Sequence, residues 1–140
     1  MNGQDFLRIA KDALAPFLKE LGFSMDSPSI SGRFYRVSFT GAAHAVSVSY
    51  EPGDESWFIL VFGREDGELT DIDDRAKTPN LADLNARYMP TISSGERAEN
   101  EAAFAFVEAR DKEELVLLKA AKELRLVLPK HLGGSKRRQL

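Results

Sequence analysis

Three short runs with the composition of β-strands follow one another between residues 34 and 62, and the segments that join them are too short to hold a helix. Residues 34–40 and 45–50 alternate apolar and polar side chains, the pattern of strands buried on one face. Residues 57–62 are apolar without a break, which indicates either a central strand covered on both faces or a strand with one exposed aromatic side. Parallel strands need a crossover of about a dozen residues or more. The three runs are therefore predicted to be antiparallel neighbours.

A fourth strand is predicted at the edge of this sheet. Residues 63–67 have the composition of a turn, and residues 68–73 carry acidic side chains that would discourage pairing with another sheet edge. Residues 24–32 are rich in Ser, Pro and Gly and are predicted as a loop. Because the helical segments lie before and after the strands, the predicted fold class is α+β: an antiparallel meander of three to five strands packed by an N-terminal helix and C-terminal helices.

The N-terminal helix is predicted over residues 4–21, where apolar residues recur at helical spacing. Pro16 lies inside this segment and removes one backbone donor, so we expect a kink near residues 12–15 or two short helices. Gly22 has the residue type that ends helices in the left-handed conformation.

Further helices are predicted after the strands. One has Thr78 as its N-cap and stops at Pro90. The next begins at a capping box of Ser93 and Glu96 and is expected to continue through residues 104–107.

A strongly apolar helix is predicted over residues 112–128, ended by Pro129. Its apolar residues cover more of the helix circumference than one sheet face can bury. Residues 102–107 or a second copy of the chain should cover the remaining apolar surface. Covering within the chain needs no partner, which favours a monomer slightly over a homodimer. The chain is expected to form a single domain over residues 1–132, followed by a mobile basic tail over residues 133–140.

The residue inventory argues against an enzyme. There is no cysteine, and no G-x-S-x-G motif places a serine nucleophile. His44 is expected at an exposed hairpin turn and His131 near a helix C-terminus, 87 positions away. We therefore predict no catalytic residue, no metal site and no cofactor. The absence of a signal-peptide pattern and of a long apolar run predicts a cytoplasmic protein without a membrane partner.

The charge distribution indicates a possible contact surface. The net charge is −3, but the segment from residue 51 to residue 74 contains nine acids and one base, Arg64. A nucleic-acid-binding protein usually shows the opposite bias, so no nucleic-acid partner is expected. The acids form the candidate partner-binding set, which comprises Glu51, Asp54, Glu55, Glu65, Asp66, Glu68, Asp71, Asp73 and Asp74.

A second candidate site combines Tyr35, Arg36 and Trp57. An arginine beside aromatic side chains could hold an anionic ligand in a pocket between the sheet and the helices. This set represents the alternative function, a small-ligand-binding or enzymatic domain.

The layout of the chain resembles a known group of proteins. Residues 17–23 (F-L-K-E-L-G-F), 46–52 (V-S-V-S-Y-E-P) and 128–130 (L-P-K) stand in an order that looks like small bacterial α+β proteins of unassigned function. Some of these resemble immunity proteins of contact-dependent inhibition and other polymorphic toxin systems. Such families are defined by their partner rather than by catalytic residues, so the resemblance implies a cytosolic inhibitor of a toxin domain and assigns no residue.

The charge map agrees with that expectation, because many toxin domains that cut nucleic acid are basic and an acidic surface attracts them. The leading prediction is a non-enzymatic protein-interaction domain, an immunity-type inhibitor that binds a basic toxin domain through its acidic surface.

Overall fold

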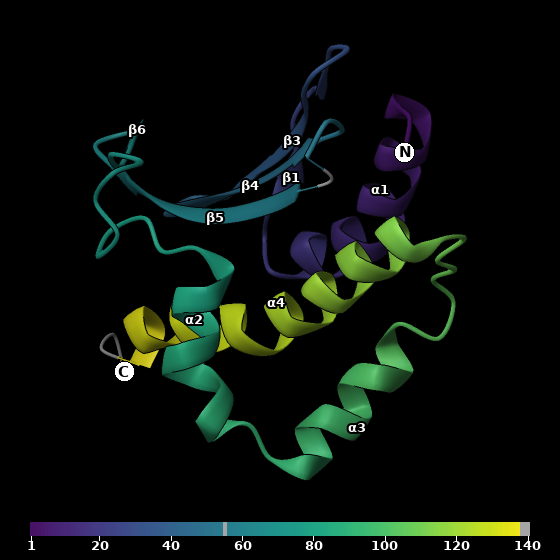
Figure 1. The fold of residues 1–140 in the computed structure, drawn as a ribbon. Coiled ribbons are helices and arrows are strands. Elements are labelled where there is room, and N and C mark those ends of the chain that lie inside the picture. The colour runs from purple at the N-terminus through teal and green to yellow at the C-terminus, as the bar shows by residue number, and fades with distance from the viewer. Residues whose placement is uncertain (55, 138–140) are drawn as a thin grey trace.

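An antiparallel sheet with helices on one side forms the fold, as the computed structural model shows for residues 1–54 and 56–137, side chains of 134–137 excepted (Figure 1). The α+β prediction is confirmed. The helices are α1 (Gly3–Glu20), α2 (Leu81–Tyr88), α3 (Ser94–Ala103) and α4 (Lys112–Arg137), with a short 3-10 helix η1 (Met89–Thr91). The strands are β1 (Ser24–Met25), β2 (Ser29–Ile30), β3 (Tyr35–Thr40), β4 (His44–Glu51), β5 (Ser56–Glu65) and β6 (Glu68–Leu69).

The sheet has the order β1-β3-β4-β5-β6, and β2 also pairs with β3. The central meander β3-β4-β5 is the one predicted from the sequence. The loop predicted over residues 24–32 is wrong in part, because two two-residue strands in it pair with the outer edge of β3. The predicted fourth strand is shorter than expected and stops at Leu69. After β6 the chain passes beside β5 again, and the Val61 amide of β5 donates to the Pro79 carbonyl at 2.9 Å.

The two faces of the sheet differ in character. The face toward the helices carries rows of apolar side chains set by the strand register, such as Val37, Val48 and Ile59. On the other face Ser47 and Ser49 are buried as well, which corrects the prediction that β4 is half-buried. Ser47 and Ser49 pair in register with Leu60 and Phe58 on β5, and Phe58 is half exposed. Of the two alternatives for residues 57–62, the strand with an exposed aromatic side is therefore confirmed.

Helix α1 supplies much of the core and ends as the sequence predicts. Gly22 has a φ of 92°, and its amide donates to the Lys19 carbonyl at 3.0 Å. The next amide, of Phe23, donates to the Leu18 carbonyl at 2.9 Å, which completes a Schellman motif. The two-helix alternative is wrong, because α1 continues through Pro16.

The start of α2 differs from the prediction. Asn80, not Thr78, is the N-cap, and it forms a capping box with Asp83. Thr78 is buried and donates its hydroxyl to the Asp71 carbonyl at 2.8 Å, so it holds the preceding loop. The capping box of Ser93 and Glu96 that begins α3 is confirmed.

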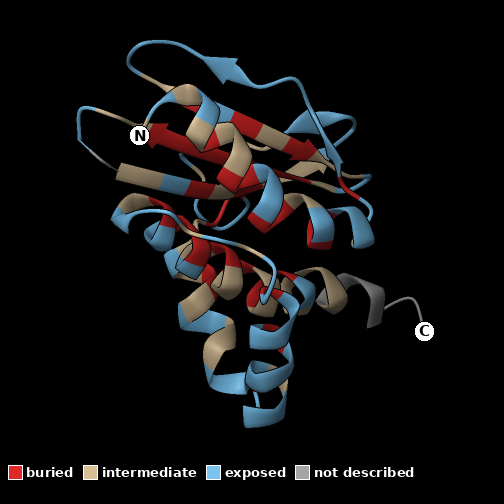
Figure 2. Ribbon diagram, turned by 90° about the vertical axis from the view of Figure 1, so that its right-hand side faces the viewer, coloured by how far each residue is buried: buried red, intermediate tan, exposed pale blue. Residues whose placement is uncertain are grey.

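Helix α3 ends at Ala103, earlier than predicted. Phe104 is buried against Phe17, with ring centroids 6.2 Å apart, but Phe106 is 97% exposed. Phe104 thus packs on α1, and residues 102–107 leave Leu115 and Val116 of α4 exposed. Whether a second copy covers them stays a prediction. Figure 2 shows the same division, with buried residues on the strands and inward helix faces and exposed residues along much of α3.

Helix α4 continues through Pro129 to Arg137, so the predicted stop at Pro129 is wrong. The proline is exposed, and the preceding Val127 and Leu128 are fully buried. Packing on both sides of the proline outweighs the loss of one helical hydrogen bond. Residues 133–137 of the predicted basic tail extend this helix, and residues 138–140 lie outside the described residues.

Candidate functional site

The acidic segment is divided by the length of β5. Glu51 ends β4 and Asp54 lies in the following turn, whereas Glu65 is the last residue of β5 and the remaining acids follow it. The strand has ten residues, which at about 3.3 Å per residue separates the two groups by about 30 Å. Glu55 lies outside the described residues. The structure therefore does not form one surface from the predicted set.

The larger group is gathered on one loop, which we call the acidic loop. Its carboxylates are Glu65, Asp66, Glu68, Asp71, Asp73 and Asp74. It begins with a two-residue hairpin turn in which Asp66 and Gly67 have φ values of 54° and 82°. Two positive φ values in succession match the type I′ turn that suits the twist of paired strands. The turn reverses the chain, so that Glu68 and Leu69 pair with the end of β5.

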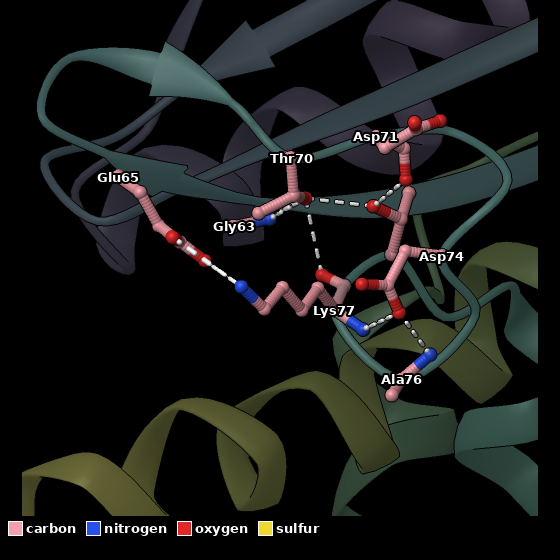
Figure 3. A network of polar contacts seen from close by, with 8 residues as sticks. Gly63, Glu65, Thr70, Asp71, Asp74, Ala76 and Lys77 are labelled. Atoms are coloured by element: carbon pink, nitrogen blue, oxygen red, sulfur yellow. Dashed lines mark hydrogen bonds and ion pairs between the residues drawn. The ribbon is translucent and has the colours of Figure 1, made fainter.

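Hydrogen bonds within the acidic loop fix its shape (Figure 3). The Gly63 amide donates to the Thr70 hydroxyl at 3.0 Å, which ties the loop to β5. The Asp74 carboxylate accepts the amides of Ala76 and Lys77 at 3.1 and 3.2 Å. These contacts restrain the backbone that carries the acids, so the charge pattern of the loop is preformed.

The acidic loop retains a strongly negative balance after its internal pairing. Lys77 lies 3.0 Å from a carboxylate oxygen of Glu65, and this pairing raises the pKa of the lysine. The side chains of Asp66, Glu68 and Asp73 are exposed. A hollow of about 340 Å³ lies among the acids of the loop. An arginine or lysine of a partner could enter it.

The structure does not bring together Tyr35, Arg36 and Trp57. Adjacent strand residues face opposite sides of a sheet, so Tyr35 points toward the helices and Arg36 toward the open face. Tyr35 and Trp57 pack against Phe6, with ring centroids 5.5 Å apart in both cases. The expected pocket between sheet and helices is filled at this point by the Phe6 ring. Arg36 instead lies 4.8 Å over the ring of Phe34 and donates to the Ser49 hydroxyl at 3.4 Å.

A group that was not predicted lies at the end of the sheet nearest the acidic loop. His44 begins β4 and His131 lies in α4, and their ring centroids are 5.5 Å apart. The Tyr88 hydroxyl, at the end of α2, lies 3.3 Å from His131 Nδ1. Both histidines are partly buried, so the exposed turn predicted for His44 is wrong. We call His44, Arg87, Tyr88 and His131 the histidine cluster.

The environment of the histidine cluster disfavours the charged form of both rings. Burial lowers the pKa of His131 to about 4, with smaller contributions from nearby His44 and Arg87. Burial also lowers the pKa of His44. Protonation of either ring is therefore less favourable in the folded protein than in the unfolded chain.

The spacing of the two histidines relative to buried residues on their own elements could have indicated the histidine cluster. His44 has the strand parity of the buried Val46 and Val48, and His131 follows Val127 and Leu128 at helical spacing. Each histidine thus continues a core-facing stripe from its own element. Sequence reasoning missed the pairing because it treated the residues separately.

No protein-family model, curated protein or solved structure matches the chain. Among the described residues, no group of three or more His, Asp or Glu side chains is placed to hold a metal ion. Within the same residues, no helix has the length and apolar composition needed to cross a bilayer.

Proposed function

We propose that this protein is a non-enzymatic interaction domain that binds a basic partner domain through the acidic loop, as an immunity-type inhibitor in the cytoplasm. The observation that carries the proposal is the display of six carboxylates on one hydrogen-bonded loop, in which Lys77 forms an ion pair with Glu65. A concentrated field of one sign accelerates association with an oppositely charged domain.

The restrained shape of the loop supports binding rather than mere solvation. Asp74 and Thr70 use their side chains to hold the backbone, while Asp66, Glu68 and Asp73 remain exposed. One set of side chains thus fixes the backbone of the loop, and a different set is free of that role and is proposed to contact the partner. A preformed loop loses less conformational entropy on binding than a flexible one.

The alternative, a small-ligand or enzymatic domain with a pocket between sheet and helices, has less support. Its aromatic residues pack against Phe6, and Arg36 lies on the opposite face of the sheet.

The proposal expects a toxin domain to be encoded beside this protein's gene, and the test measures the Kd of that domain by calorimetry; the lack of such a neighbouring gene would itself overturn the proposal. In the test variant, Glu68→Gln and Asp73→Asn neutralise two exposed acids of the loop. The matched control, Glu51→Gln with Asp54→Asn, neutralises acids at the other end of β5. We expect the loop variant to weaken binding about tenfold or more and the control to change it less than about twofold. Equal effects, or no binding by the unmodified protein, would overturn the proposal.

A further inference from the structure

The face of the sheet that points away from the helices, which we call the outer face, is the face that no helix covers (Figure 1). The strand register arranges its side chains in three rows that cross β3, β4 and β5. The first row is Arg36, Ser49 and Phe58, the second is Ser38, Ser47 and Leu60, and the third is Thr40, Ala45 and Phe62.

The outer face changes in character from strand to strand. Along β5 it is apolar, since Phe58 is 50% exposed and Leu60 and Phe62 are half-buried. Along β4 it carries only Ala and Ser in the three rows, and along β3 it is polar. An apolar stripe therefore lies beside a strand of small side chains, a shape that a second flat sheet can approach closely.

The outer face also carries one charge of each sign at opposite ends of β3. Arg36, in the first row, is exposed and contacts the Phe34 ring and the Ser49 hydroxyl. Asp26 lies beside the third row, where its carboxylate accepts a hydrogen bond from the Thr40 hydroxyl at 2.6 Å. Among the described residues, neither Arg36 nor Asp26 has an ion-pair partner. Both charges are thus available to a partner.

We propose that the outer face is the interface of a symmetric homodimer, in which a second copy of the chain packs sheet against sheet. The two-fold axis crosses the strands along the second row, so the first row of one copy lies over the third row of the other. Arg36 then meets Asp26 of the partner subunit, and symmetry forms this ion pair twice.

The same axis brings apolar side chains together. Phe58 lies over Phe62 of the partner subunit, and Leu60 lies over Leu60 of the partner subunit. The small side chains of β4 meet at the centre, where they permit the usual separation of about 10 Å between packed sheets. An axis parallel to the strands would instead place Arg36 over Phe58 of the partner subunit and leave Asp26 without a cation. Charge complementarity therefore favours the crossing axis.

The size of the outer face is sufficient for a weak dimer. It is four strand positions wide, because β1 and β2 pair with the same edge of β3, and β4 is eight residues long. At about 4.8 Å between strands and about 3.4 Å per residue, it covers about 500 Å² on each copy. The total of about 1,000 Å² lies at the lower limit for a specific interface, so the dimer should form at micromolar concentrations. This interface does not use the acidic loop.

The experiment measures the dimer Kd by sedimentation equilibrium at protein concentrations from about 5 to about 500 µM. We expect a species of twice the chain mass for the unmodified protein. Phe58→Ser should weaken the dimer about tenfold or more. The matched control is Leu115→Ser, which removes a similarly exposed apolar side chain from α4 and should change the Kd less than about twofold.

A charge reversal tests the geometry of the dimer. Arg36→Glu and Asp26→Arg, made separately, each bring like charges together and should weaken the dimer about tenfold. The double variant restores opposite charges and should return the Kd to within about threefold of the unmodified value. Because recovery requires a folded protein, it cannot arise from a loss of structure.

Three results would each overturn the proposal. The first is a protein that stays monomeric over the whole concentration range. The second is equal weakening by the Phe58 and Leu115 substitutions, which would place the second copy elsewhere. The third is a double variant that dimerises no better than the single charge variants. All four substituted positions are exposed, so the changes remove no core packing.

Discussion

Acidification should destabilise the protein through His131. The pKa of this ring falls from 6.5 to about 4 on folding, so between these values the unfolded chain binds a proton that the folded protein excludes. The stabilisation is fully present above pH 6.5 and is lost as pH falls toward 4. At about pH 5 the full shift would correspond to about 2 kcal/mol, and screening by solvent around the partly exposed ring reduces the loss to about 1 kcal/mol.

The assay is urea unfolding at about pH 7.5 and at about pH 5, in buffers without phosphate. His131→Gln provides the comparison, because glutamine does not titrate and can still bond to the Tyr88 hydroxyl. The unmodified protein should lose about 1 kcal/mol more than the variant between the two pH values. Equal losses in both proteins would refute the reasoning, since the loss would then come from other groups.

Three further substitutions test the packing and the helix ends by urea unfolding. Glu114→Gln should cost about 2 kcal/mol, because this 1%-exposed carboxylate pairs with Arg8 and accepts a backbone amide; a cost below about 0.5 kcal/mol would contradict a buried charged contact. Ser93→Ala should cost about 1 kcal/mol through loss of the α3 cap, and no change would mean that the cap is dispensable. Gly22→Ala should cost about 1 kcal/mol because of its positive φ, whereas Gly32→Ala, equally open but without a positive φ, should not destabilise the protein. Equal effects of the two glycine changes would contradict the left-handed helix end.

The central sheet could be predicted from the sequence because its information is local. Alternation and short connections specify the β3-β4-β5 meander, and Gly22 specifies the end of α1. Two predictions of helix ends were wrong. Pro129 was expected to end a helix, but buried neighbours hold the helix together across it. Thr78 was expected to cap α2, but it is used for the loop that precedes that helix.

The candidate sites were harder to predict because they depend on distance in space. The described acids between residues 51 and 74 are close in sequence but lie in two groups, because β5 runs between them. His44 and His131 are distant in sequence and meet because each extends a core-facing stripe. Local sequence patterns predicted the helices and strands. Which helix and strand ends lie next to one another depends on tertiary packing, which those patterns do not contain.

The most direct test of the proposed function is the dependence of the association rate on salt. We would measure the association rate constant with the neighbouring-gene toxin domain by stopped flow, for the unmodified protein and the loop variant, between about 0.05 and 0.5 M NaCl. If the acidic loop attracts the partner, the rate for the unmodified protein should fall about tenfold or more, and the loop variant should start lower and change little. The same salt dependence in both proteins would contradict a function that depends on the acidic loop.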